Sequence, residues 1–334
     1  MTAHHAAAAL RQTWPPFVLV AGLLLIGAVA AADDLFEAVG ARVAGLRIGA
    51  VPLLLALLAV DAVVTVVLNL DTAVVFLTPV LLHGARRRGL SEAPFLYGCV
   101  FMANASSTLL PGSNLTNLLV LGRTSGTAFA GRTALPWLVS VAITAAFVAI
   151  VLPPRTHRAA TGPVPPLRIG VGLVATVAAA VAVLVLHDAA LPVLAIGVVA
   201  CLLRRVLPRL DARVPAVLFV VAVALGTLAR AWNGPAHLLA TSGRWTTGAL
   251  AAGLSVLVNN LPAAVLLSAQ PPPHPIALLL GLDLGPNLAV TGALSAVLWW
   301  QAARAAGTRP SIVRFTVLGV VLTPLTLAAS LALS

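Results

Sequence analysis

Apolar runs of about 20 residues recur along this chain, separated by short stretches that contain Arg, Gly and Pro. A helix of that length crosses the hydrocarbon core of a bilayer, so each run predicts a membrane-spanning helix. Uninterrupted runs lie at 15–32, 131–152, 167–186, 189–207, 214–231 and 312–333. Two longer spans, 92–122 and 275–303, contain the polar stretches NASSTLLPGSNLTN and GLDLGPNLAVTG, which predict breaks in the helices.

Two further apolar stretches, 48–84 and 245–270, are interrupted in the middle by NLDT (69–72) and NNLP (259–262). Each stretch either crosses the membrane once or returns as a hairpin. If both return, fifteen arginines lie on one face of the membrane and five on the other; if both cross, the division is nine against eleven. Cytoplasmic loops concentrate basic residues, so the pattern favours two hairpins, with both chain termini outside the cytoplasm.

The same order of elements occurs twice. A span, a hairpin, a broken span and a span fill residues 1–152, and the same series ends the segment 169–334 after two additional spans. Because an odd number of crossings separates the two series, the second is predicted to be inverted relative to the first. A cytoplasmic linker at 153–168 is predicted to join them.

A sequence match supports this repeat: Thr65 and Asn69 correspond to Ser255 and Asn259 at an offset of 190 residues. Inverted repeats with discontinuous helices are a common plan of secondary transporters. We therefore predict an all-α polytopic membrane protein in which each repeat has a re-entrant helical hairpin and a broken transmembrane helix.

The composition is that of a membrane protein. Mean hydropathy is +1.05 and only 9% of residues are charged, against about a quarter in soluble domains. The net charge of +11 comes from arginines scattered over short loops, which suits membrane orientation and not nucleic-acid binding. Cys99 and Cys201 lie in or beside apolar runs, so neither a disulfide framework nor a metal centre is predicted. We predict a transporter, not an enzyme, with no cofactor.

Three of the nine acidic residues, Asp61, Asp71 and Asp283, lie within predicted membrane segments. Aspartates at that depth usually face a polar cavity or a proton relay, so these three are candidates for proton coupling. Amide and hydroxyl side chains accumulate at the same breaks. The predicted substrate- or ion-binding residues are Asn69, Asp71, Thr72, Ser113, Asn114, Asn117, Asn259, Asn260, Asp283 and Asn287.

The chemistry of these breaks limits the substrate. Non-helical backbone at membrane depth survives only where it is buried in protein or lines water, so the four breaks are expected to meet at one site. No Arg or His lies near the predicted midplane. Such a site suits a neutral hydroxylated solute, or an anion held by helix dipoles alone.

Four stretches carry a family resemblance: LDTAVVFLTP (70–79), SNLTN (113–117), NNLPAAVLLSA (259–269) and GLDLGPNLAVTGALSAVLW (281–299). They resemble the arsenite/antimonite efflux permeases, within a superfamily of ion transporters. The resemblance implies metalloid efflux driven by inward proton movement. It places the hairpin tips at Asp71 and at Asn259, Asn260 and Pro262. The unwound segments would be formed by Ser113, Asn114 and Asn117 and by Asp283, Gly285 and Pro286.

The chain departs from that family in three respects. Leu70 separates the amide of Asn69 from Asp71, Asn287 replaces a family lysine, and two leading spans are missing. A carrier for a carboxylate, another oxyanion or sodium and protons, within the same superfamily, is therefore the second hypothesis. An intramembrane aspartyl protease is a remote third one. A homodimer and a separate ATPase subunit remain open as partners, beside the lipid bilayer.

Overall fold

The computed structural model describes residues 3–121, 126–156, 166, 169–186, 188–207 and 213–334. Over these residues the chain is helical, and its only β interaction is an isolated bridge between Leu90 and Thr156. The predicted all-α class is confirmed. Most of the predicted linker, at 157–165 and 167–168, lies outside the described residues.

The first half contains seven α-helices and one short 3-10 helix among its described residues. They are α1 (Ala3–Ala32), α2 (Leu35–Ala44), α3 (Ala50–Val67), α4 (Leu70–Arg88), α5 (Ala93–Ser106), η1 (Pro111–Ser113), α6 (Leu115–Leu121) and α7 (Gly126–Val151). The predicted interruptions at 69–72 and 104–117 are thus real ends of helices.

Two helices, α8 (Val171–Val185) and α9 (Ala190–Arg204), separate this series from the second one. The second series comprises α10 (Arg213–Ala231), α11 (Gly234–Ala240), α12 (Arg244–Val258), α13 (Asn260–Leu267), α14 (Pro275–Leu284), η2 (Gly285–Leu288), η3 (Val290–Gly292), α15 (Leu294–Ala305) and α16 (Ile312–Ala332). The order of helices and breaks matches that of the first half. Inversion of the two halves and re-entry of the hairpins remain predictions.

Four helices among the described residues are long and apolar enough to cross a membrane. The corresponding segments are Ala6–Ala32, Ala50–Val67, Thr127–Val151 and Ile312–Ala332. Several shorter apolar helices, including α8, α9 and α14, accompany them. This composition is that of a polytopic membrane protein, as predicted.

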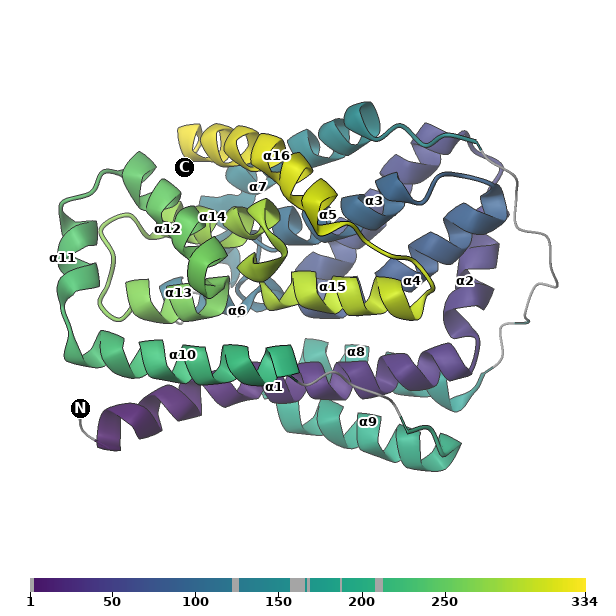
Figure 1. The fold of residues 1–334 in the computed structure, drawn as a ribbon, viewed down its shortest axis with the longest axis horizontal. Helices are drawn as coiled ribbons and strands as arrows, with labels where there is room; N and C mark the ends of the chain where they lie inside the picture. The colour runs from purple at the N-terminus through teal and green to yellow at the C-terminus, as the bar shows by residue number, and fades with distance from the viewer. Residues whose placement is uncertain (1–2, 122–125, 157–165, 167–168, 187, 208–212) are drawn as a thin grey trace.

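Helix α1 packs with α8, α9 and α10 along one side of the molecule, and α2 and α11 connect this layer to the remaining helices (Figure 1). Small residues allow the closest of these contacts. A Cβ atom on Gly22 of α1 would lie 2.6 Å from the backbone nitrogen of Leu194 in α9. The two helix backbones therefore approach each other directly, as small residues permit in membrane proteins.

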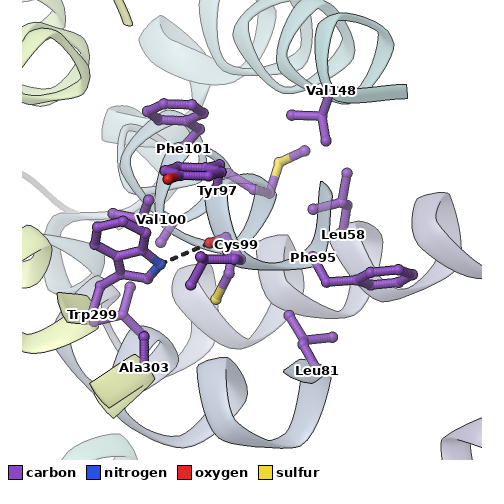
Figure 2. Close-up of a cluster of buried hydrophobic side chains, with 14 of the residues drawn as sticks. Leu58, Leu81, Phe95, Tyr97, Cys99, Val100, Phe101, Val148, Trp299 and Ala303 are labelled. Atoms are coloured by element: carbon purple, nitrogen blue, oxygen red, sulfur yellow. Dashed lines mark hydrogen bonds between the residues drawn. The ribbon is translucent and has the colours of Figure 1, made fainter. Parts of the chain in front are cut away.

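The largest apolar cluster joins the two halves. Trp299 of α15 donates its indole N–H to the carbonyl oxygen of Leu96 in α5 over 2.7 Å, and its ring packs beside Tyr97 (Figure 2). Phe315 of α16 packs against both Trp299 and Phe101. Aromatic contacts of this kind bind helices that are some 200 residues apart into one core.

A polar cluster also ties the ends of α4 and α15. The guanidinium group of Arg86 donates to Glu92 (Nε–Oε1 2.6 Å), to the carbonyl oxygen of Ala306 and to the hydroxyl of Thr308. Thr308 in turn donates to Glu92 over 2.6 Å. Burial by itself would raise the pKa of Glu92, but the hydrogen bonds from Arg86 and Thr308 and the Arg86 charge lower it below its usual value.

Candidate functional site

The first interruption is an N-cap. Asn69 has an extended backbone (φ 172°), and its side-chain oxygen accepts a hydrogen bond from the N–H of Thr72 over 2.7 Å. This contact satisfies one of the free N–H groups that begin α4. Asp71 lies in the first turn of α4 and is partly exposed.

The second interruption is more strained. Asn259 has a φ of +78°, a conformation that residues other than glycine seldom adopt. Its side-chain oxygen accepts from the N–H of Leu261 at 3.4 Å, while its Nδ2 donates to the carbonyl oxygen of Thr291 at 3.0 Å. Asn259 thereby caps α13 and connects this tip to the second unwound segment.

The first unwound segment, between α5 and α6, is held by its own polar side chains. Asn117 donates its Nδ2 to the carbonyl oxygens of Ser107 (2.7 Å) and Leu110 (2.8 Å). The hydroxyl of Ser113 contacts the same two carbonyl oxygens at 2.5 and 2.6 Å. Backbone oxygens freed by the break are thus satisfied within the protein, which makes such a break tolerable at membrane depth.

The second unwound segment follows α14 and is tied to the first. Asp283 accepts hydrogen bonds on Oδ1 from Asn114 (Nδ2, 2.9 Å) and Thr116 (Oγ1, 2.6 Å). Its other oxygen, Oδ2, is buried and has no hydrogen-bond partner within the described part of the chain. Asn104 donates to the side-chain oxygen of Asn287 over 2.8 Å, and Ser295 donates to Asn104 at 3.3 Å.

Residues from all four breaks line one open pocket. The lining residues are Leu70, Asp71, Asn114, Leu115, Asn260, Leu261, Ala293, Leu294 and Ser295. The expectation that the breaks meet at one place therefore agrees with the geometry.

Only part of the predicted residue set lines this pocket. Asp71, Asn114 and Asn260 do so. The others shape the breaks without lining the pocket: Asn69, Thr72, Ser113, Asn117, Asn259, Asp283 and Asn287. Asp61 lies elsewhere, buried on α3.

Ser295, Thr116 and Asn104 were missing from the predicted set. Ser295 lines the pocket, Thr116 holds Asp283, and Asn104 holds Asn287. The signal that could have identified Ser295 is its position in the first turn of a helix that restarts after the TG pair at 291–292.

Helices α4, α13 and α15 all begin at the pocket. The start of a helix carries roughly half a positive elementary charge and free N–H groups. No Arg or His is among the residues that line the pocket in the described part of the chain. The electrostatics of the pocket therefore arise from helix dipoles, amides and the carboxyl group of Asp71.

Comparison with known protein families gave one match. The sequence pattern of a family described as citrate transporter (CitMHS) matches residues 3–298, which is most of the chain. No curated protein matches it. The match confirms the predicted transporter superfamily and favours a transporter over a protease, whereas it does not support the predicted arsenite/antimonite permease specifically. The chain is a multi-pass membrane protein that belongs to the citrate transporter family CitMHS.

Proposed function

We propose that this protein is a secondary active transporter for a small carboxylate, carried together with protons. The observation that carries this proposal is the meeting of three helix N-termini with Asn114 and Asn260 at a pocket whose described lining residues include no arginine or histidine. Free N–H groups at these helix starts are a suitable binding surface for carboxylate oxygens. The family match supports a carboxylate substrate.

Asp71 gives this pocket a means of coupling. An ionised carboxylate in the first turn of α4 would repel a bound anion and cancel much of the positive potential of the helix starts. A protonated Asp71 removes that repulsion. Anion and proton therefore favour each other's binding and travel in the same direction.

This coupling differs from the predicted exchange of metalloid for protons. A neutral trihydroxy solute gains nothing from protonation of Asp71, whereas a carboxylate does. We accordingly place the carboxylate ahead of arsenite or antimonite as the substrate. Sodium bound beside Asp71 would neutralise the same charge, so the test must separate the two cations.

The test is uptake of labelled citrate by the purified chain in proteoliposomes, under an inward proton gradient or an inward sodium gradient. Citrate accumulation with the proton gradient is expected in the wild type. It should be lost in Asp71→Asn, which should still exchange citrate for citrate without a gradient. Asp188→Asn, a change of an exposed acid between α8 and α9, is the matched control.

Two outcomes would contradict the proposal. Undiminished gradient-driven accumulation in Asp71→Asn would remove Asp71 from the coupling. Transport of labelled arsenite with no movement of citrate would restore the metalloid hypothesis.

A further inference from the structure

Asp61 is a buried acid that the pocket does not use. It lies in the middle of α3 with no exposed surface, and both of its carboxyl oxygens lack a hydrogen-bond partner among the described residues. Buried polar groups are nearly always paired, so a carboxyl group with two unpartnered oxygens requires an explanation.

The surroundings of Asp61 are apolar. Helix α3 packs against α4, α5 and α7, and the titratable group that interacts with Asp61 is the thiol of Cys99 on α5. The sulfur atom of Cys99 lies 3.5 Å from the hydroxyl of Thr78 on α4. Figure 2 shows Cys99 inside the main apolar cluster, with Leu81 and Phe95 close by. Among the described residues, no basic side chain interacts with Asp61.

The cation that suits the carboxyl group of Asp61 is a proton. An ionised carboxylate beside a weakly donating thiol, with no counter-charge among the described residues, is very costly in an apolar interior, and a proton removes that cost. A metal cation of the sodium or calcium type would require about six oxygen ligands. Thr65 and Thr78 offer two hydroxyls, while the backbone around Asp61 is engaged in an intact helix. The chemistry therefore selects a proton.

A polar row connects Asp61 to the pocket. Thr65 follows Asp61 by one turn on the buried face of α3, and its buried hydroxyl also has no hydrogen-bond partner among the residues that the structure describes. Asn69 follows by another turn, at the break where Leu70 and Asp71 reach the pocket. At 1.5 Å per residue, Asp61 lies about 12 Å along the helix from that break.

The positions of the second half that correspond to Asp61 and Thr65 carry no acid. At the offset of 190 residues, Ala251 corresponds to Asp61 and Ser255 to Thr65. The hydroxyl of Ser255 donates to the carbonyl oxygen of Ala252 over 2.7 Å, so it is satisfied locally. Helix packing at this position therefore does not require an acid, and the free hydroxyl of Thr65 is specific to the first half.

We propose that Asp61 is a second proton-binding residue of the transport cycle, filled and emptied through Thr65 and the helix break at Asn69. Side chains four residues apart on a helix are neighbours, so a change of rotamer can bring the Thr65 hydroxyl to Asp61. The carboxyl O–H of Asp61 then donates its proton to this hydroxyl, which passes its own proton to water at the helix break; the reverse transfer refills Asp61. The role in the cycle rests on the proposed function. The proton site itself does not.

Infrared difference spectroscopy of the purified chain tests the proton site directly. At neutral pH the wild type should show the C=O band of a protonated carboxyl group that is absent from Asp61→Asn. In Thr65→Val the band should remain, but its shift in D₂O should slow by about tenfold or more, since one transfer step is lost. Ser255→Ala, the matched change in the second half, should leave the band and its shift unaltered.

Three results would overturn the proton site or its route through Thr65. These are the same carboxyl bands in wild type and Asp61→Asn, equal rates of D₂O shift in wild type and Thr65→Val, or loss of the band when sodium is added at constant pH. Because Thr65→Val retains Asp61, the D₂O shift of its carboxyl band can still be measured if Asp61→Asn fails to fold.

Proteoliposomes test the role in the cycle. The number of protons taken up per citrate should be smaller by one in Asp61→Asn than in the wild type, while the Kd for citrate stays the same. An unchanged ratio would overturn the role. If the wild type moves no citrate at all, the proposed function fails, and the infrared result still decides whether Asp61 binds a proton.

Discussion

Asn114 of the first half donates a hydrogen bond to Asp283 of the second half, with Nδ2 and Oδ1 2.9 Å apart. Thr116 donates to the same oxygen over 2.6 Å. One carboxyl oxygen thereby fixes the start of α6, and with it the Asn114 side chain that lines the pocket. The two unwound segments hold each other in position.

Removal of this carboxyl group should weaken both folding and binding. Asp283→Ala removes the shorter hydrogen bond of each of two buried donors and leaves them only contacts of 3.4 Å (Asn114 to Ser107) and 3.5 Å (Thr116 to Asn117). A poorly satisfied buried donor costs up to about 1–3 kcal/mol, so thermal unfolding in detergent should occur at a lower temperature. Asp283→Asn keeps an accepting oxygen for Asn114 and Thr116 and should be much closer to wild type. Citrate affinity should fall with Asp283→Ala because Asn114 loses its anchor.

The same pair of variants tests the predicted role of Asp283 in proton coupling. If Asp283 only positions Asn114, Asp283→Asn transports citrate with the wild-type ratio of protons to citrate. A lower ratio would show that Asp283 carries a proton itself. Equal stability of Asp283→Ala and wild type would contradict the anchoring role.

Gly319 of α16 should tolerate no side chain. A Cβ atom there would lie 1.7 Å from the carbonyl oxygen of Asn287, a backbone atom of the unwound segment. Gly319→Ala is expected to destabilise the protein by about 1–3 kcal/mol or more and to reduce citrate binding, because η2 must move. Gly253→Ala on α12, where nothing lies within 4 Å, is the matched control and should be neutral or slightly stabilising. Similar melting temperatures for the two variants would contradict the close contact of α16 with η2.

The two interruptions should respond differently to glycine. At Asn259 (φ +78°) a change to Ala loses the cap and keeps the strain, at a cost of about 1–3 kcal/mol, whereas Gly relieves the strain and should be the milder change. At Asn69 the backbone is extended, so Gly offers no such relief over Ala. Thermal unfolding of the four variants checks this. If Gly were no better than Ala at position 259, strain at this tip would be refuted.

The cluster of Arg86, Glu92 and Thr308 should make stability depend on pH. Glu92 has a lowered pKa in the folded protein, so its contribution is fully present above the unfolded value of about 4.3 and disappears as the pH falls through the lower, folded value. The difference in unfolding temperature between wild type and Glu92→Gln should therefore be largest near neutral pH and should shrink in acid. Asp188→Asn is the control, and a difference that grows in acid would contradict the prediction.

Most of the architecture could be predicted from the sequence. The apolar runs gave the long helices, and NLDT, NNLP and the two Gly-, Pro- and Asn-rich stretches gave the breaks, because such residues cannot continue a helix without leaving backbone groups unsatisfied. The short helices α2 and α11 were missed. Each has ten residues or fewer, too short to span a bilayer, and α2 carries Glu37 and Arg42 as a loop would.

The apolar runs and the Gly-, Pro- and Asn-rich stretches between them thus determined where helices run and where they stop, since both are local consequences of side-chain chemistry. Only the tertiary structure decided which polar residues at the breaks face the pocket. Asp71 and Asp283 look alike in the sequence, yet Asp71 lines the pocket while Asp283 is turned towards Asn114 and Thr116. The direction of a side chain beyond a helix end depends on which donors the other half of the chain brings to it. No local pattern contains that information.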